Sequence, residues 1–422
     1  MRALYSLSIF FFGISIRIAS LFNSKARLWI SGRKNLFDKL EEHFQNNKGR
    51  VAWFHCASLG EFEQGRPLLE EFKKRNPDYK ILLTFFSPSG YEVRKNYAGA
   101  DIICYIPLDT KSNARRFLKL VNPTVVYFVK YEFWLNFLGE FRKNKISHFL
   151  VSAIFREDQI FFKTYGSIFR DALKGFTFIF TQEKKSIDLL NSIGIDHAEI
   201  AGDTRFDRVA QIAANAKEIP IAKSFSGEER KVIVAGSTWP SDEKIIFPVL
   251  GELIQNEWKL IIAPHELSEN HLLAIEKGLL DVGVSPVKII RYSQANENNS
   301  TSSKVLIIDN IGMLSALYAY GRIAFIGGGF GKSIHNILEA AVFGMPVIFG
   351  PRFEKFNEAF ELIENGAAFG INNENELKKI LDKVSNDPQL LELLSNQSRE
   401  FVQNHRGATN KILEKSNSLI NH

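Results

Sequence analysis

Cysteine is nearly absent from this sequence, and so are several common catalytic motifs. The two cysteines, Cys56 and Cys104, lie in apolar runs, which excludes a disulfide scaffold, and no Cys/His pattern has metal-ligand spacing. A Walker phosphate loop and a Gly-x-Ser-x-Gly elbow are both missing, which disfavours ATP hydrolysis of the P-loop kind and serine-hydrolase chemistry. No Asp-x-Asp pair is present to hold a metal–diphosphate. We therefore expect chemistry that uses no metal and no other cofactor.

Residues 51–422 have no net charge. Residues 1–50 carry nine Lys or Arg against three Asp or Glu, a surplus that equals the formal net charge of the whole chain, +6. The rest of the chain is balanced, so the composition predicts no nucleic-acid groove and no nucleic-acid partner.

The basic N-terminus is also apolar. Arg17 is the only charge between Ala3 and Phe22, and Lys25, Arg27, Arg33 and Lys34 follow this run. A spanning helix needs about 20 apolar residues, so the length is borderline. We expect residues 1–24 to anchor the protein to the lipid surface of the inner membrane, on its cytoplasmic face. The alternative is a buried helix of the first domain.

Short apolar runs rich in Val, Ile and Phe alternate with helical segments along the rest of the chain. They lack the alternation of a half-exposed strand, so they predict parallel strands buried on both faces. The runs are Val51–Cys56, Lys80–Thr84, Val125–Val129, His148–Ser152, Phe176–Thr181, Lys231–Ala235, Lys259–Ala263, Val305–Ile308, Ile323–Ile326 and Pro346–Phe349. We predict an α/β protein with two doubly wound, Rossmann-like domains, residues 25–210 and 211–422, facing a cleft.

A glycine cluster follows the run Ile323–Ile326. Gly327, Gly328 and Gly329 allow a tight turn and close approach of a ligand. A helix is expected from about Ser333 to Phe343, and its first N–H groups would favour a phosphate. On that helix His335, Asn336 and Glu339 would share one face, where a carboxylate can bind ribose hydroxyls. The alternative is a packing loop with a solvated polar face.

Two acidic motifs follow strands of the first domain. Ser58 and Glu61, with Gly60 between them, come directly after Val51–Cys56. Glu61 could take a proton from an attacking hydroxyl, although Ser58 and Glu61 also fit a helix capping box. Lys130 and Glu132 follow Val125–Val129 and could instead form a structural ion pair.

Polar residues also end the strands of the second domain. Gly236, Ser237 and Thr238 offer donors for a phosphate or carboxylate, and His265 follows the next strand. Gly312 and Met313 could pack against a base, but His265 could equally be an ordinary loop histidine and Gly312 part of a plain turn.

Together these motifs resemble the 3-deoxy-D-manno-octulosonic acid (Kdo) transferases of lipopolysaccharide synthesis. The resemblance rests on Ala57-Ser-Leu-Gly-Glu61, Val129-Lys-Tyr-Glu-Phe-Trp134, Ala235-Gly-Ser-Thr238, Ile311-Gly312 and the segment from Gly327-Gly328 to His335-Asn336-x-x-Glu339. It implies a GT-B glycosyltransferase that moves Kdo from CMP-Kdo to a lipid A precursor, lipid IVA, with inversion and without a metal.

The resemblance also implies roles for individual residues. Glu61 would be the general base and Glu132 a second acidic residue of the acceptor site. The substrate-binding candidates are Ser58, Gly60, Lys130, Gly236, Ser237, Thr238, His265, Gly312, Met313, Gly328, Gly329, His335, Asn336 and Glu339. In one departure, Pro264-His265-Glu266 stands where many members have Pro-Arg-His. Either His265 or Lys332 replaces the expected arginine near the nucleotide, or the contact with the donor differs.

Two other functions fit the same pattern of strands and loops. One is another metal-free GT-B enzyme that uses a UDP-sugar, either a glycosyltransferase or a nucleotide-sugar epimerase. The other is a non-catalytic, membrane-bound protein that binds a nucleotide-sugar. An epimerase with a soluble substrate has no use for a basic apolar anchor, and Glu61 with Glu132 argues against a binding protein.

Overall fold

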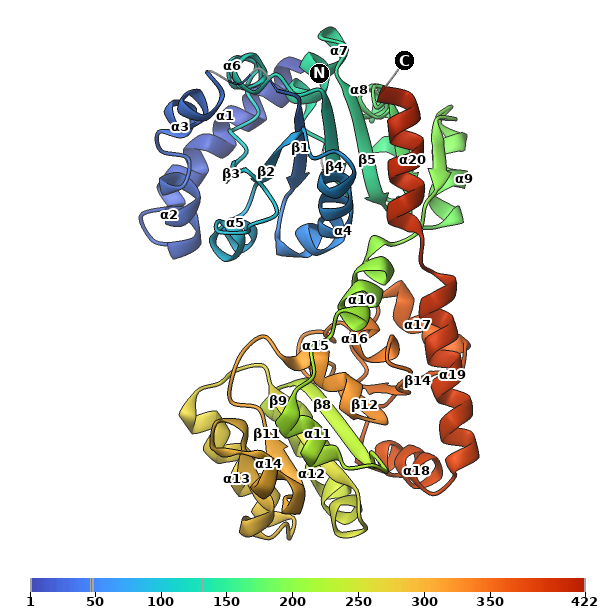
Figure 1. Ribbon diagram of the computed structural model, residues 1–422. Helices are drawn as coiled ribbons and strands as arrows, with labels where there is room; N and C mark the ends of the chain where they lie inside the picture. Colours follow the sequence, from blue (N-terminus) through green and yellow to red (C-terminus); the bar gives the residue numbers. More distant parts are fainter. Residues whose placement is uncertain (1, 46, 48, 131–132, 421–422) are drawn as a thin grey trace. The chain divides into compact units, whose positions relative to one another are not determined.

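The computed structural model describes residues 2–45, 47, 49–130 and 133–420 of the chain. The chain forms two compact units (Figure 1). Unit 1 contains residues 1–208 and 406–422, and unit 2 contains residues 209–405. The second domain was expected to run from 211 to the C-terminus, whereas the structure places residues 406–422 with unit 1.

Unit 1 is built on a sheet of seven parallel strands in the order β3-β2-β1-β4-β5-β6-β7. The strands are β1 (Val51–Cys56), β2 (Lys80–Phe85), β3 (Ile102–Tyr105), β4 (Val125–Val129), β5 (Ser147–Ala153), β6 (Phe178–Thr181) and β7 (Ala198–Ile200). Every residue of β1 and β4 is buried, as expected of central strands covered on both faces. The chain order reverses between β1 and β4, which pair directly.

Helices cover both faces of this sheet. They are α1 (Arg2–Ala19), α2 (Ser24–Ser31), α3 (Leu36–Phe44), α4 (Leu59–Arg75), α5 (Pro88–Arg94), α6 (Lys111–Val121), α7 (Leu135–Lys143), η1 (Ile160–Phe162), α8 (Ser167–Leu173), α9 (Lys184–Ser192) and α20 (Ala408–Ile420). Helix α10 (Thr204–Ala214) leads into unit 2. Trp53 belongs to the core on one face and Phe54 to the core on the other. The second core also includes Ile412 and Leu413, so α20 completes unit 1.

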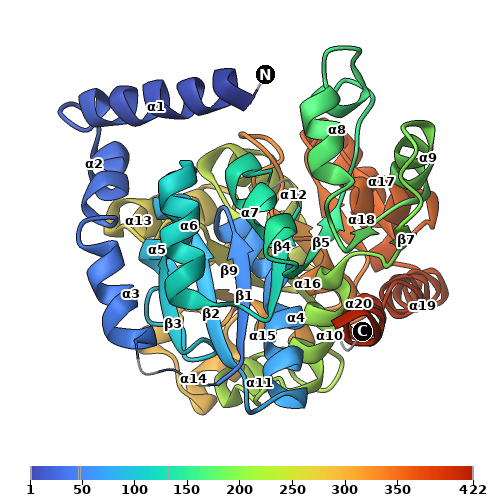
Figure 2. The ribbon, with the colours of Figure 1, turned by 90° about the horizontal axis from the view of Figure 1, so that it is seen from above.

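Helix α1 runs along the outside of unit 1, where α2 follows it after a sharp bend (Figure 2). Its Tyr5 hydroxyl donates to the buried Asp109 carboxylate at 2.5 Å. The exposed apolar side chains of α1 and the following turn include Leu4, Leu7, Phe10, Phe11, Ile18, Leu21 and Phe22. The alternative of a buried N-terminal helix is therefore wrong. Within the described residues no one helix is long and apolar enough to span a membrane; α1 and α2 meet that test only as a pair bent by 120°.

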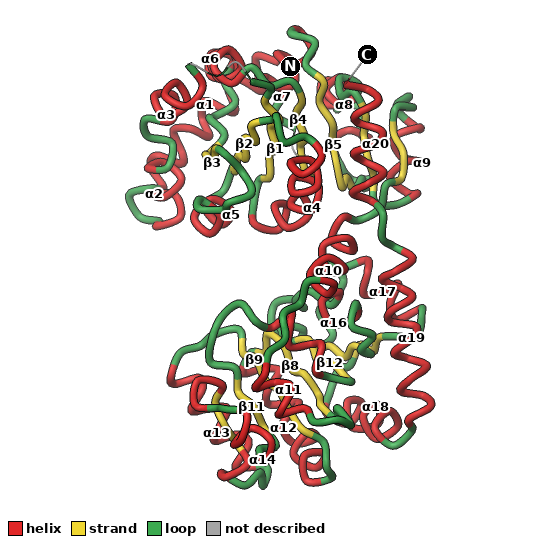
Figure 3. Tube along the Cα trace, in the orientation of Figure 1, coloured by secondary structure: helices red, strands yellow, loops and turns green. Residues whose placement is uncertain are grey.

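Unit 2 contains a second sheet, whose strands are yellow in the lower part of Figure 3. It has seven parallel strands in the order β10-β11-β9-β8-β12-β13-β14. The strands are β8 (Val232–Thr238), β9 (Lys259–Pro264), β10 (Ile289–Arg291), β11 (Val305–Ile307), β12 (Ile323–Ile326), β13 (Val347–Phe349) and β14 (Ala368–Gly370). Its helices are α11 (Pro220–Ser226), α12 (Pro240–Gln255), α13 (Glu269–Asp281), η2 (Pro286–Lys288), η3 (Tyr292–Gln294), α14 (Glu297–Ser302), α15 (Leu314–Leu317), η4 (Tyr318–Tyr320), α16 (Leu338–Ala341), α17 (Asn357–Glu364), α18 (Glu374–Ser385) and α19 (Pro388–Asn404). The prediction of two doubly wound domains is confirmed.

The expected helix from Ser333 to Phe343 is wrong. Only α16 (Leu338–Ala341) forms there, because the N–H groups of Ile334 and His335 donate instead to the carbonyl groups of Arg352 and Gly327, at 3.2 and 3.1 Å. His335 and Asn336 therefore precede the helix that carries Glu339. So short a helix also provides no N-terminal phosphate site of the expected kind.

Candidate functional site

The switch point of unit 1 carries the Ser58–Glu61 motif. Ligands of open α/β sheets bind where the strand order reverses, at the carboxyl ends of the strands. Ser58 lies at the N-cap of α4, and Glu61 lies in the first turn of that helix. The Ser58 side chain makes no capping hydrogen bond; its hydroxyl donates to the Glu61 carboxylate. The pair therefore does not act as the capping box that the spacing allowed.

Lys130 directly follows the neighbouring strand β4 and has an unusual backbone conformation. Its φ is +72°, in the left-handed region that residues with a side chain rarely adopt. Its N–H donates to the carbonyl of Val151 at 2.9 Å, which holds the turn against β5. Glu132, the second predicted acid, lies outside the described residues. A strained residue at a strand end of the switch point is typical of a functional loop.

A buried polar network holds the segment that follows Lys130, and the sequence analysis missed it. The Trp134 indole donates to Nε2 of His55 at 3.2 Å, and His55 Nδ1 lies 2.8 Å from the Thr84 hydroxyl. Because Nε2 accepts, a neutral His55 carries its proton on Nδ1 and donates to Thr84. Trp53 donates to the same hydroxyl at 2.7 Å. The signal in the sequence was a histidine inside an otherwise apolar strand.

The switch point of unit 2 lies between β8 and β12, and Ser237 occupies it. Ser237 has a φ of +54°, and the pairing of β8 with β9 shifts register around it. Such an irregularity re-aims a side chain at a sheet edge. The Ser237 hydroxyl has no hydrogen-bond partner in the described part of the chain. A ligand group could therefore use it.

The neighbours of Ser237 have structural roles. A Cβ on Gly236 would lie 2.1 Å from the hydroxyl of buried Tyr318, so only glycine fits there. The buried Thr238 hydroxyl donates to Glu243 at 2.9 Å, and Glu243 also contacts His271 at 3.0 Å. Packing and internal hydrogen bonds thus account for Gly236 and Thr238.

Asp242 organises the glycine loop, which the sequence analysis did not anticipate. Its buried carboxylate accepts hydrogen bonds from the N–H groups of Gly328 at 2.7 Å, Phe330 at 3.2 Å and Trp239 at 2.9 Å. The N–H of Gly328 is therefore already used inside the protein and is not available to a ligand phosphate. A Cβ on Gly329 would lie 2.6 Å from the Gly350 nitrogen, so Gly329 permits close packing of two backbones.

Three aromatic rings stack beside this loop. The His265 ring lies between the rings of Trp239 and His335, with centroids 4.5 and 4.7 Å away. The Trp239 indole also donates to Nε2 of His335 at 3.3 Å. Burial lowers the pKa of His335 below its ordinary value, and the neighbouring His265 lowers it further. Trp239 and His335 line a cavity of about 410 Å³ together with the exposed Lys332.

A cluster of hydrogen bonds joins the segment at Gly312 and Met313 to the segment that contains Asn336 and Glu339. Asn336 donates to one carboxylate oxygen of Glu339 at 3.1 Å, and the Ser315 hydroxyl donates to the other. Ser315 lies in α15, directly after Gly312 and Met313, so this bond ties that loop to Glu339. Gly312 has a φ of +98°, which favours glycine. Asn336 and Glu339 were expected to meet on one helix face; they meet across the start of α16 instead.

Two doubly wound units with polar residues at both switch points define a GT-B fold. Solved structures with this architecture include the UDP-GlcNAc 2-epimerase of Neisseria meningitidis, with a TM-score of 0.59, 17% identity and coverage of 86% of this chain and 98% of that one. MurG of Acinetobacter baumannii has a TM-score of 0.57 at 11% identity, covering 87% of this chain and 99% of that one. These likenesses show the fold alone.

Sequence relatives identify the family. The profile of the 3-deoxy-D-manno-octulosonic-acid transferases (kdotransferases) matches residues 34–208. The 3-deoxy-D-manno-octulosonic acid transferase of Aquifex aeolicus is 30% identical over 350 residues, which cover 82% of this chain and 88% of the relative. The Rickettsia felis enzyme of the same name is 28% identical, over 86% of this chain and 78% of its own. The chain belongs to the Kdo transferase family and is a glycosyltransferase.

Proposed function

We propose that the protein transfers Kdo from CMP-Kdo to a lipid A precursor, lipid IVA, with inversion at the anomeric carbon. Membership of the Kdo transferase family supports Kdo as the transferred sugar. The observation that carries the mechanism is the position of Glu61 at the switch point of unit 1, where Ser58 engages its side chain instead of capping α4.

Glu61 is the general base in this proposal. Its carboxylate takes the proton of an acceptor hydroxyl as that oxygen bonds to the anomeric carbon and the bond from that carbon to CMP breaks. A single displacement of this kind inverts the anomeric centre. The Ser58 hydroxyl orients the carboxylate through its hydrogen bond. Glu132 is proposed as the second acid of the acceptor site and Lys130 as a neighbouring cation, with Gly60 leaving the approach to Glu61 open.

The donor binds in unit 2. The Glu339 carboxylate accepts hydrogen bonds from the ribose hydroxyls of CMP while Asn336 and Ser315 hold it in place. Ser237, Gly312 and Met313 are its proposed neighbours at the nucleotide. Lys332, which lines the same cavity as His335, supplies positive charge in place of the arginine that the family resemblance implies. The proposal includes no metal, so activity should survive a chelator.

The exposed apolar surface of α1 supports attachment to the inner membrane. An interfacial helix lies in the plane of a bilayer with its apolar face in the headgroup region and basic residues beside it. Phe10, Phe11 and Ile18 provide such a face, and Arg17, Lys25 and Arg27 provide the charge. We propose that α1 docks the protein on the cytoplasmic face of the membrane that contains its lipid acceptor.

Replacement of Glu339 tests the donor site. Glu339→Ala removes charge-assisted hydrogen bonds worth about 1.5–3 kcal/mol, so CMP should bind roughly 10- to 100-fold more weakly in calorimetry. Glu354→Ala is the matched control, because Glu354 is an exposed carboxylate of the same unit. An unchanged CMP affinity in folded Glu339→Ala would mean that the cluster serves packing.

The same titration distinguishes the UDP-sugar alternatives. A donor site for CMP-Kdo should bind CMP and show little heat with UDP at equal concentration. Preference for UDP would favour another GT-B glycosyltransferase or an epimerase.

A further inference from the structure

A larger cavity of about 890 Å³ lies in unit 2, away from the candidate donor site. Arg230 precedes β8, Arg322 precedes β12 and Gly344 precedes β13, and these three strands are neighbours in the sheet. The cavity therefore opens at the amino-terminal edge of the sheet. Ser237 and the glycine loop lie at the opposite, carboxyl-terminal edge. The cavity is a separate site in the same unit.

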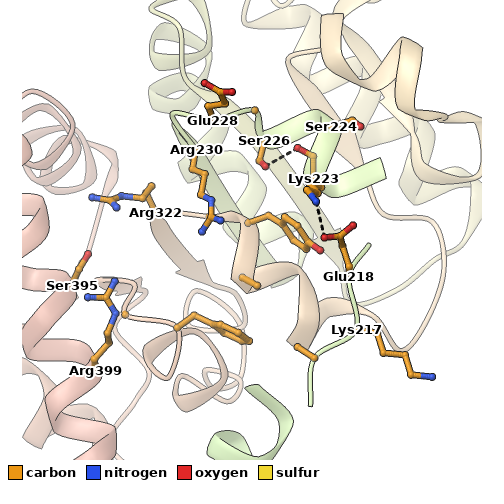
Figure 4. Close-up of a pocket in the computed structure, with 17 residues that line it drawn as sticks. Lys217, Glu218, Lys223, Ser224, Ser226, Glu228, Arg230, Arg322, Ser395 and Arg399 are labelled. Atoms are coloured by element: carbon orange, nitrogen blue, oxygen red, sulfur yellow. Dashed lines mark hydrogen bonds and ion pairs between the residues drawn. The ribbon is translucent and has the colours of Figure 1, made fainter. Parts of the chain in front are cut away.

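Positive charge gathers around this cavity. Five cationic side chains line it against two carboxylates, although unit 2 as a whole carries 18 Lys or Arg against 24 Asp or Glu. The cations are Lys217, Lys223, Arg230, Arg322 and Arg399, and the carboxylates are Glu218 and Glu228. Arg230 and Arg322 lie in the loops before β8 and β12, and Arg399 lies on α19 (Figure 4).

Several of these cations remain available to a ligand. Glu218 neutralises Lys223 at 2.7 Å. One carboxylate, Glu392, serves both Arg322, at 3.2 Å, and Arg399, at 3.6 Å. The side chains of Lys217 and Arg230 have no hydrogen-bond or ion-pair partner among the described residues. A guanidinium has five N–H donors, so one shared carboxylate leaves most of them unused.

Specific contacts hold the side chains that line the cavity in place. A Cβ on Gly344 would lie 2.4 Å from the Arg399 Nε, so glycine lets this guanidinium lie flat against the backbone. Asn396 accepts a hydrogen bond from Arg399 at 2.7 Å and fixes its direction. The lining also contains the rings of Tyr320 and Phe343, and the Tyr320 hydroxyl is held by the Ile219 N–H at 2.6 Å.

We propose that this cavity binds an organic phosphate. Guanidinium groups match the oxygens of a phosphoryl group in paired hydrogen bonds, and Arg230, Arg322 and Arg399 all line this cavity. The two rings accept the less polar part of the ligand. The volume is that of an ordinary small-molecule site, and the inference does not depend on the proposed function. The phosphate could belong to a soluble metabolite or to a lipid headgroup.

Calorimetry on the full chain in detergent, with CMP saturating, tests whether the ligand is a soluble phosphate. Inorganic pyrophosphate is the probe, and Lys217→Ala/Arg230→Ala is the cavity variant. Loss of two charge-assisted contacts should weaken binding at least about tenfold. Lys277→Ala/Lys379→Ala is the matched control, since both lysines are exposed in unit 2 and lie outside the cavity lining. Neither variant removes a hydrogen bond or an ion pair within the described residues, and thermal melting checks that both fold.

Sedimentation with vesicles that contain phosphatidylglycerol tests the lipid source with the same three proteins. Selective loss of pyrophosphate binding in the cavity variant supports a soluble phosphate. Selective loss of vesicle binding alone supports a lipid headgroup. Equal behaviour of cavity and control variants in both arms, or no binding of either probe by the wild type, overturns the proposal.

Discussion

Glu61 and Glu63 lie two residues apart on α4, yet their surroundings differ. Glu61 accepts a hydrogen bond from Ser58, whereas Glu63 pairs with Arg94 at 2.8 Å. Glu61→Gln should lower turnover at least about 100-fold, because positioned proton transfer contributes about 10²–10⁴-fold, and should leave CMP affinity nearly unchanged.

Glu63→Gln is the control for that experiment, since it makes the same chemical change next to a structural arginine. Turnover should stay near that of the wild type. Near-normal turnover of Glu61→Gln, or an equal loss in both variants, would remove Glu61 from the role of base.

The sequence predicted the positions of many residues at strand ends but not their partners. Ser58, Glu61 and His265 follow strands as expected, because a buried parallel strand has a clear apolar signature, whereas β8 continues past its predicted end at Ala235 and includes Ser237. The role of Asp242 could not be predicted from its sequence neighbours. Its carboxylate accepts hydrogen bonds from the N–H groups of Gly328 and Phe330, which lie more than 80 residues away in sequence.

At the scale of elements, prediction was best for the central strands. β1, β4 and β12 begin and end at the predicted residues, while β3, β7, β10 and β14 at the sheet edges were missed. β7 is only three residues long and partly exposed, so it has no continuous apolar run. Residues 333–337 have a helical apolar pattern, but the N–H groups of Ser333, Ile334 and His335 donate to the carbonyl groups of Gly328, Arg352 and Gly327 instead of forming a helical turn.

The hydrogen bond from Tyr5 of α1 to Asp109 is one contact that attaches α1 to unit 1, and it predicts a pH-dependent stability. Burial raises the pKa of Asp109 above its ordinary value, while the hydrogen bonds it accepts from Tyr5 and from two backbone N–H groups lower it. Tyr5→Phe removes one of these donors and should raise that pKa further. Stability should fall by about 1–3 kcal/mol where Asp109 is ionised, as for a buried acceptor that loses a partner.

The sign of the pH effect follows from proton linkage. When folding raises the pKa of a carboxyl group, the protein loses stability as the pH rises through the folded-state pKa. Tyr5→Phe raises the pKa of Asp109 further, so the variant should lose more stability than the wild type. The difference in melting temperature between wild type and Tyr5→Phe should therefore be larger at pH 8 than near pH 4. Tyr165→Phe, at an exposed tyrosine, should show no difference at either pH. A deficit that grows toward acid pH would contradict this account.

At the scale of the whole molecule, the apolar surface of α1 predicts membrane binding. Phe10→Glu/Phe11→Glu places charge on two exposed side chains and leaves Tyr5 intact. Burying one such ring is worth roughly 1.5–3 kcal/mol, so affinity for anionic vesicles should fall at least about tenfold. Activity on bilayer-embedded acceptor should fall with it, and activity on detergent-dispersed acceptor should fall less.

Leu273→Glu/Leu393→Glu is the control, because it places the same charges on exposed leucines of unit 2. Vesicle binding should be unchanged in this variant. Equal loss in both double variants would show that added negative charge alone repels the protein from the vesicles.

The most direct test of the central claim is the mass of the product. The purified full chain is incubated with CMP-Kdo and a lipid A precursor in detergent, and the lipid is analysed by mass spectrometry. We predict a lipid heavier by Kdo, with release of free CMP, and almost no such product from Glu61→Gln. An unmodified lipid in the presence of folded wild-type protein, or equal transfer by the wild type and Glu61→Gln, would contradict the account.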